Sequence, residues 1–361
     1  MILLLAACNP TETDTEAPEA PWTAPDQRGP YAAGVTTLDF TDARGKALTV
    51  EVWYPAAPAD GDEPDRYAEF PVTRNAYREA PAVPGPWPLV AFSHGNAGIR
   101  WQSIFLTEHL AEHGFVVVSP DHNFNTFLDY DDTKTVDVLL ERPGDVAAAV
   151  DAIVARSTDG DPLLGGTVTG DRYAMVGHSF GGWTTMVVAG GLVDLAGYNA
   201  HCASSNDALC GIVGDLPVDA TLPSPDPRAV LAIPMAPCGW YTMGSFGPAS
   251  LAPSLYLGGG LDTTCPMATE VHPAFEHSPA PKIEAVLPLA GHFAFSDLCT
   301  LAPTMSPECD EQDAGYGVIA DEQLAVQTVV TAFLGTRLAE DERYAPWLGD
   351  DRPPAFTWTA E

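Results

Sequence analysis

The stretch Met175-Val-Gly-His-Ser-Phe-Gly-Gly-Trp183 (MVGHSFGGW) places one serine, Ser179, between two glycines and between two apolar runs. The run before it, residues 173–176, is typical of a buried strand, and residues 180–189 are typical of a helix. The serine therefore lies in a sharp turn at a helix N-terminus, an end that attracts developing negative charge. The glycines fit this turn because larger side chains beside Ser179 would collide with neighbouring elements. We predict that the turn projects the Ser179 hydroxyl as a nucleophile.

On both sides of this turn, apolar runs typical of strands alternate with runs of helical periodicity. The alternation predicts an α/β fold, a mostly parallel sheet with helices on both faces, preceded by a hairpin that turns at residues 42–45. Residues 191–227 interrupt the pattern, so we predict an insertion there, before the sixth strand, near the sheet edge where ligands bind. The predicted later strands are 87–92, 115–119, 173–176, 230–235, 254–257 and 283–287, and the predicted helices are 99–113, 142–156, 180–189 and 323–338.

A serine hydroxyl is a poor nucleophile without a base, and the base needs an acid to orient it. His292 directly follows the predicted strand 283–287, and Asp262 follows the predicted strand 254–257 after three glycines. Both residues lie at strand ends, where they can reach the serine turn, so we predict His292 as the base and Asp262 as the acid. The rivals lie in helical stretches or in the insertion, and they are His201, His272 and His277 for the base and Asp219 and Asp226 for the acid.

The oxyanion that forms on an attacked carbonyl needs hydrogen-bond donors. One donor is expected from the main chain just after the nucleophile, at Phe180. The other is expected from a loop after an earlier strand, and the loop Phe92-Ser-His-Gly-Asn-Ala-Gly98 has this position. We predict the main-chain N–H of Asn96 as the second donor, and we interpret His94 as a brace of the loop.

The N-terminal sequence MILLLAAC is apolar but too short to span a bilayer, and it lacks the positive charge that begins a secretory signal. Its last four residues, Leu5 to Cys8, resemble the bacterial lipobox, in which the cysteine carries lipid. The alternative is a wrongly chosen start codon ahead of an ordinary secreted protein. The predicted organisation is a signal or lipobox remnant at 1–8, an acidic proline-rich tether at 9–30, an α/β domain at 31–345 and a C-terminal tail at 346–361.

Six cysteines follow Cys8, and an even number in an exported chain indicates disulfides. Their spacing favours the local pairs Cys202–Cys210 and Cys299–Cys309, which leaves Cys238 and Cys265 as the third pair. The alternative is that some of the six are buried free thiols. No Cys or His spacing fits a zinc site, and we expect neither a metal nor another cofactor.

The charge of the chain is strongly negative, with 16 basic and 49 acidic residues and a net charge of −33. Such a chain repels nucleic acid and anionic membrane surfaces and disfavours polyanionic substrates. A salty habitat and a general need for solubility both account for the acidic excess.

Together these residues resemble the α/β-hydrolase superfamily, in which Ser179, Asp262 and His292 match the nucleophile, acid and base. The resemblance extends to the platelet-activating-factor acetylhydrolase and dienelactone-hydrolase-like branch, and to cutinase-like polyester hydrolases, including those that degrade polyethylene terephthalate. It rests on the segments AFSHGNAG, LAEHGFVVVSPDH, GHSFGGW, GGLDTTCP and AGHF.

The resemblance implies a serine carboxylic-ester hydrolase that acts on a neutral or zwitterionic ester, such as a short-acyl ester, an oxidised phospholipid or a polyester. Trp240 resembles an aromatic residue that flanks the ester in cutinase-like enzymes, and an ordinary core tryptophan is the alternative. Two features depart from the cutinase-like pattern. Asn96 stands at the oxyanion position where cutinase-like enzymes usually have an aromatic residue, and the insertion at 191–227 is longer than their connection. The other hypotheses are a serine amidase or peptidase of this fold, and a non-catalytic binding lipoprotein. We expect a monomer, with Cys8 as its membrane tether.

Overall fold

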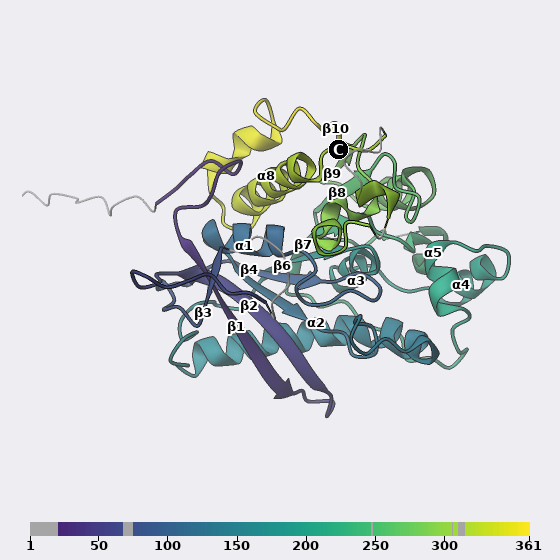
Figure 1. Ribbon diagram of the computed structural model, residues 1–361. Coiled ribbons are helices and arrows are strands. Elements are labelled where there is room, and N and C mark those ends of the chain that lie inside the picture. The colour runs from purple at the N-terminus through teal and green to yellow at the C-terminus, as the bar shows by residue number, and fades with distance from the viewer. Residues whose placement is uncertain (1–20, 68–74, 247, 305, 310–314) are drawn as a thin grey trace, which may run out of the picture.

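The structure of the protein is a computed structural model with one ten-stranded sheet at its centre (Figure 1). The predicted lipid attachment site, Cys8, and residues 9–20 of the predicted tether lie outside the described residues. The described residues are 21–67, 75–246, 248–304, 306–309 and 315–361.

The strands follow the order β10-β9-β8-β7-β6-β4-β5-β2-β1-β3 across the sheet. The central strands run parallel to one another, and they are β5, β4, β6, β7, β8 and β9. Three strand pairs are antiparallel, and they are β2 with β5, β1 with β2 and β10 with β9. The short β3 pairs with β1 in parallel. The strands are β1 Ala32–Thr41, β2 Ala47–Ala56, β3 Ala76–Arg78, β4 Leu89–Ser93, β5 Val116–Pro120, β6 Tyr173–His178, β7 Ala229–Met235, β8 Ser254–Gly259, β9 Lys282–Leu287 and β10 Thr357–Ala360.

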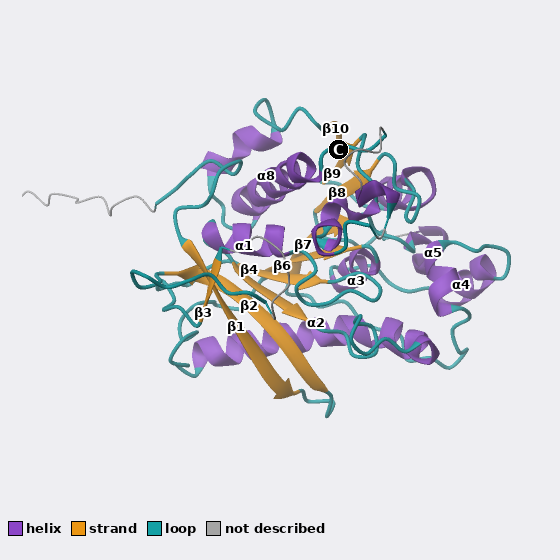
Figure 2. Ribbon diagram, viewed as in Figure 1, coloured by secondary structure: helices purple, strands orange, loops and turns teal. Residues whose placement is uncertain are grey.

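Helices cover both faces of the sheet (Figure 2). Apolar residues of α1 and α8 pack on one face in one core cluster, and those of α2, α3 and α6 pack on the other face in a second cluster. No helix among the described residues has the length and apolar character needed to cross a membrane. The helices are α1 Ile104–Glu112, α2 Thr135–Thr158, α3 Phe180–Val188, α4 Leu195–Cys202, α5 Ala208–Val213, α6 His272–His277, α7 Leu298–Leu301 and α8 Ile319–Arg337.

This architecture confirms the predicted α/β-hydrolase fold, a mostly parallel sheet with helices on both faces. The boundaries of three predicted helices differ, and the last of them, α8, begins at Ile319 instead of residue 323. α2 begins at Thr135 instead of Arg142, and it runs through Pro143. A proline inside a helix removes one backbone hydrogen bond, but the first turns of α2 bury Val138 and Leu139 against the sheet. α1 begins five residues later than predicted, because residues 95–102 form a loop whose contacts are described below.

Both ends of the described chain pack onto the domain. Within the predicted tether, Arg28 forms an ion pair of 2.6 Å with Glu112 of α1, and the ring of Trp22 lies 5.9 Å from that of Tyr344. Within the predicted C-terminal tail, β10 adds an edge strand beside β9. The predicted insertion, residues 191–227, contains α4 and α5, which lie to the right of α3 in Figure 1.

Candidate active site

Ser179 occupies the turn between β6 and α3, as the sequence predicts. Its φ of 58° lies in the left-handed region, which a residue with a side chain adopts only under strain. The surroundings enforce this conformation: the Ser179 N–H donates to the Met235 carbonyl at 2.9 Å. A side chain on Gly181 would overlap the Ser93 carbonyl, and one on Gly177 would overlap the Gly181 carbonyl. The glycines therefore allow α3 to pack tightly against β4 while the serine stands at the turn.

His292 and Asp262 form a buried pair at the ends of β9 and β8. The His292 Nδ1–H donates to Asp262 Oδ2 at 2.7 Å. The other carboxylate oxygen, Oδ1, accepts the main-chain N–H groups of Thr264 and Cys265, both at 2.8 Å. Burial by itself would raise the pKa of Asp262, but the hydrogen bonds from His292 and from these N–H groups outweigh it and lower that pKa. Asp262 is therefore ionised, and it holds His292 in the tautomer whose Nε2 can accept a proton.

The rival histidines each have another polar partner. His201 Nε2 lies 2.6 Å from an Asp207 oxygen, and His272 Nδ1 lies 3.0 Å from a Glu284 oxygen. His277 donates to a main-chain carbonyl within α6. Of the rival carboxylates, Asp226 forms an ion pair of 2.7 Å with Arg228. The structure thus brings Asp262, and not Asp226, to His292.

The two predicted oxyanion donors line the same cavity as Ser179 and His292. Among the described residues, neither the Asn96 N–H nor the Phe180 N–H has a hydrogen-bond acceptor. The first N–H of a helix has no partner inside the helix, so the Phe180 donor stays available for a ligand. His94 holds the loop: its Nδ1–H donates to the Gly95 carbonyl at 2.8 Å, and its Nε2 accepts the main-chain N–H of His122 at 3.1 Å.

The cavity has a volume of about 520 Å³, and its walls are mainly apolar. One wall comes from α5 of the insertion, through Leu209 and Ile212, and another comes from α7, through Leu298 and Leu301. The remaining apolar lining residues are Ala97, Ile99, Phe127, Phe180, Ala208, Cys238, Phe293 and Ala302.

Trp240 is not among the residues that line this cavity. Its indole N–H donates to the Thr269 carbonyl at 2.8 Å, and its ring stacks on His277 with centroids 4.9 Å apart. Its role in substrate binding stays a prediction, because the described contacts of the side chain are to other parts of the protein.

A buried relay that no sequence motif indicated forms part of the cavity lining. Gln102 Oε1 accepts the Gly95 N–H at 2.7 Å, and Gln102 Nε2 lies 2.7 Å from His178 Nδ1. His178 Nε2 lies 2.9 Å from the main-chain carbonyl of His292. Burial is the main cause that lowers the pKa of His178 to about 3, and the charge of His292 is the second. The ring is therefore neutral, with one nitrogen that donates a hydrogen bond and one that accepts. The relay joins the oxyanion loop to the loop that carries the base. The one available signal was the placement of a polar residue, His178, directly before the nucleophile.

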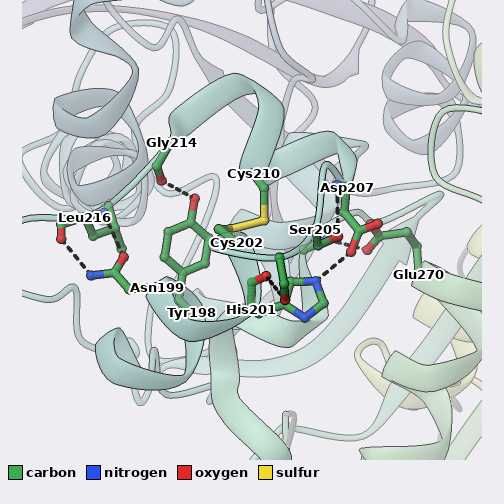
Figure 3. The surroundings of a disulfide bond; sticks show 12 residues. Tyr198, Asn199, His201, Cys202, Ser205, Asp207, Cys210, Gly214, Leu216 and Glu270 are labelled. Carbon is green, nitrogen blue, oxygen red and sulfur yellow. Dashed lines mark hydrogen bonds and ion pairs between the residues drawn. A yellow bond between two sulfur atoms is a disulfide. The ribbon is translucent and has the colours of Figure 1, made fainter.

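Three disulfides hold the walls of the cavity and confirm the predicted pairs Cys202–Cys210, Cys238–Cys265 and Cys299–Cys309. The first joins α4 to α5, and Figure 3 shows it beside Tyr198 and Asn199. The Tyr198 hydroxyl donates to the Gly214 carbonyl at 2.8 Å, which holds the chain after α5 against α4. Within the described ranges, no group of His, Cys, Asp and Glu side chains is arranged to hold a metal ion.

The chain is similar in sequence to cutinases from Thermobifida species. It is 29% identical over 207 residues to Cutinase 2 of Thermobifida cellulosilytica, to Cutinase cut1 of Thermobifida fusca and to Cutinase est1 of Thermobifida alba. The match covers 57% of this chain and 60%, 49% and 53%, respectively, of the relatives' own lengths. No protein-family model matches the chain. The chain is therefore related at a distance to cutinases, and it has the α/β-hydrolase fold.

Proposed function

We propose that the protein is a serine carboxylic-ester hydrolase that works through an acyl-enzyme. One observation carries the proposal: the serine turn, the paired imidazole and carboxylate, and two unoccupied main-chain donors meet in one apolar cavity. Each of these groups has a distinct part in acyl transfer, and together they supply a nucleophile, a base, an orienting acid and an oxyanion hole.

The reaction proceeds in two steps. Ser179 Oγ bonds to the ester carbonyl carbon as its proton passes to His292 Nε2, and the carbonyl electrons move to the oxygen. This oxyanion accepts hydrogen bonds from the N–H groups of Asn96 and Phe180. When it collapses, the bond to the alcohol breaks, and His292 returns the proton to the leaving oxygen. A water then attacks the acyl-serine by the same route and releases the acid. These steps use only side chains and main-chain groups of the protein itself.

Asp262 stabilises the His292 imidazolium that forms in each step. Its lowered pKa keeps it negative while the ring is positive, so the proton stays on the imidazole. The helix α3 begins directly after the reacting serine, and its N-terminus adds a positive partial charge there. Removal of one oxyanion donor typically costs about 100- to 1000-fold in rate.

The substrate we propose is an uncharged or zwitterionic ester with a short or medium acyl chain. The apolar walls of the cavity favour an alkyl chain over a charged group. The net charge of −33 disfavours anionic thioesters and anionic surfaces. Acetylated phospholipids and polyesters such as polyethylene terephthalate fit this chemical class. The cavity between α5 and α7 favours a free chain end or a small ester over a polymer surface.

We further propose that the protein is exported as a monomer, and that Cys8 carries the lipid that anchors it. Disulfides form and persist in oxidising compartments, and three of them surround this site. Globomycin treatment of expressing cells and mass spectrometry of the mature N-terminus test the anchor. A lipid-free N-terminus would exclude it.

The first test is hydrolysis of p-nitrophenyl esters from acetyl to palmitoyl, with Ser179→Ala as the control. We expect the highest kcat/KM for the shorter chains and complete loss in the variant, together with loss of fluorophosphonate labelling. No turnover of any ester by folded wild-type protein would refute the proposed function. Product release from a polyester film and from an acetylated phospholipid then decides between the finer substrate classes.

A further inference from the structure

Arg142 of α2 is fully buried, and none of its hydrogen-bond partners is charged. Its Nε donates to Thr184 Oγ1 at 3.0 Å, and its Nη1 donates to Asn125 Oδ1 at 2.6 Å. Its Nη2 donates to Ser93 Oγ at 3.0 Å and to the main-chain carbonyl of His94. All four acceptors are neutral, so these hydrogen bonds of the guanidinium are all to dipoles.

Asp145, three residues further along the helix, interacts favourably with the Arg142 charge and also shares its oxygens with other groups. It forms ion pairs with Arg44 at 2.7 Å and with Lys46 at 2.9 Å, and His122 Nδ1 lies 3.0 Å from it. Burial of a guanidinium carries a desolvation cost, which its neutral acceptors and the attraction of Asp145 offset only in part. Burial lowers the pKa of Arg142 to about 9, which leaves the group protonated at neutral pH.

The contacts of Arg142 converge on the oxyanion hole. Through Asn125, whose Nδ2 donates to Asn96 Oδ1 at 2.8 Å, the guanidinium fixes the side chain of one oxyanion residue. Its bond to the His94 carbonyl fixes the loop two residues before that donor. On the other side, its Cζ lies 4.5 Å from the ring centre of Phe180, the second oxyanion residue.

We propose that Arg142 is a positioning residue for the oxyanion hole, and that its buried positive charge favours the negative charge that develops there. This inference rests on the proposed ester hydrolysis. In the resting protein the charge is attracted by Asp145 and bonded to neutral acceptors, and during acyl transfer the oxyanion adds a further negative charge at the residues that Arg142 contacts. An interaction that exists only in the transition state raises kcat and leaves substrate binding unchanged. The fixed fork of the guanidinium also holds both donors in place, which the flexible ammonium of a lysine does less well.

The direct test is Arg142→Met, compared with two matched controls on the same helix. Arg156→Met removes a charge from an exposed part of α2, and Leu139→Ala destabilises the buried part of α2 at a residue that does not line the cavity. We expect Arg142→Met to lower kcat by about 10- to 100-fold with KM within about twofold, and Arg142→Lys to fall in between. Both controls keep the wild-type kcat at temperatures where they are folded.

Inhibitors separate positioning from a structural role. An alkyl trifluoromethyl ketone adds to the serine and forms an oxyanion, whereas the matching methyl ketone binds largely without forming one. In Arg142→Met, affinity for the trifluoromethyl ketone falls by the same factor as kcat, and affinity for the methyl ketone is unchanged. Equal losses for both ketones, or wild-type kcat in folded Arg142→Met, would overturn the inference.

Asn125→Asp provides a second variant that keeps Arg142 in place if Arg142→Met does not fold. The substitution is isosteric, and it gives the guanidinium a carboxylate partner while removing the donor to Asn96. We expect unchanged or higher thermal stability together with a kcat at least about tenfold lower. A purely structural Arg142 would leave kcat unchanged or improve it, and that result would overturn the inference. Inactive wild-type protein would refute the proposed function instead, so the two failures are distinguishable.

Discussion

Replacement of Asp262 by asparagine tests the site most sharply, because the structure dictates how the new amide must sit. Oδ1 accepts two main-chain N–H groups, so the amide oxygen of asparagine takes this position. The opposite orientation would set an NH₂ group against two buried donors, at a cost of about 1–3 kcal/mol for each unmet hydrogen bond. The amide NH₂ therefore faces His292 Nδ1, which lies 2.7 Å from Oδ2 in the wild type.

This orientation forces the wrong tautomer of His292. Since Nδ1 must now accept a hydrogen bond, the proton moves to Nε2, and Nε2 can no longer take the proton of Ser179. We expect kcat to fall by about 10,000-fold, which corresponds to about 5 kcal/mol of lost transition-state stabilisation. The pocket keeps its shape, so KM stays within a few-fold of the wild-type value.

The assay is steady-state hydrolysis of p-nitrophenyl butyrate, combined with the rate of fluorophosphonate labelling at Ser179. Circular dichroism checks that the variant is folded. The matched control is Asp226→Asn, which changes a rival carboxylate that pairs with Arg228 away from His292. The reasoning is refuted if Asp262→Asn keeps more than about a tenth of wild-type kcat, or if Asp226→Asn loses as much activity as Asp262→Asn.

Three further predictions concern the frame of the site. Gly181→Ala puts a methyl group into the main chain at the end of β4, so we expect loss of folded protein or of fluorophosphonate labelling. Wild-type labelling in soluble Gly181→Ala would contradict this. Joint replacement of Cys238 and Cys265 by alanine removes a cross-link that spans 27 residues, so we expect the free energy of unfolding to fall by about 3–4 kcal/mol. Urea titrations measure this change, and an unchanged midpoint would argue against it. Burial raises the pKa of Glu270 from 4.5 to about 8, so the folded protein binds the extra proton and its stability falls as pH rises through this window. In Glu270→Gln the free energy of unfolding should fall less steeply with pH, by up to about 1.4 kcal/mol per pH unit. Urea titrations between pH 5 and 8 measure this slope, and an unchanged slope would contradict the raised pKa.

Much of the fold could be predicted because its signals are local. Short apolar runs that alternate with helical periodicity gave strands within about two residues of β4 to β9, since parallel strands are buried on both faces. The helix boundaries were harder. α2 continues through Pro143 because tertiary burial of its first turns outweighs one lost backbone hydrogen bond, and no local pattern reports that balance. The edge strand β10 is equally non-local, because it exists only through its pairing with β9.

The candidate site shows the same difference between local sequence signals and non-local contacts. By itself, the sequence determined which residues are the candidate nucleophile, acid and base, because each follows a strand and the strand ends of a parallel sheet meet at one edge. Only the tertiary structure decided that Arg142 bonds to the oxyanion loop, that Gln102 lines the cavity beside His178 and that Trp240 lies outside the cavity wall. Those positions depend on contacts between side chains far apart in the chain, such as Arg142 with Ser93 and Gln102 with His178. Packing creates such contacts, and strand periodicity or turn chemistry does not encode them.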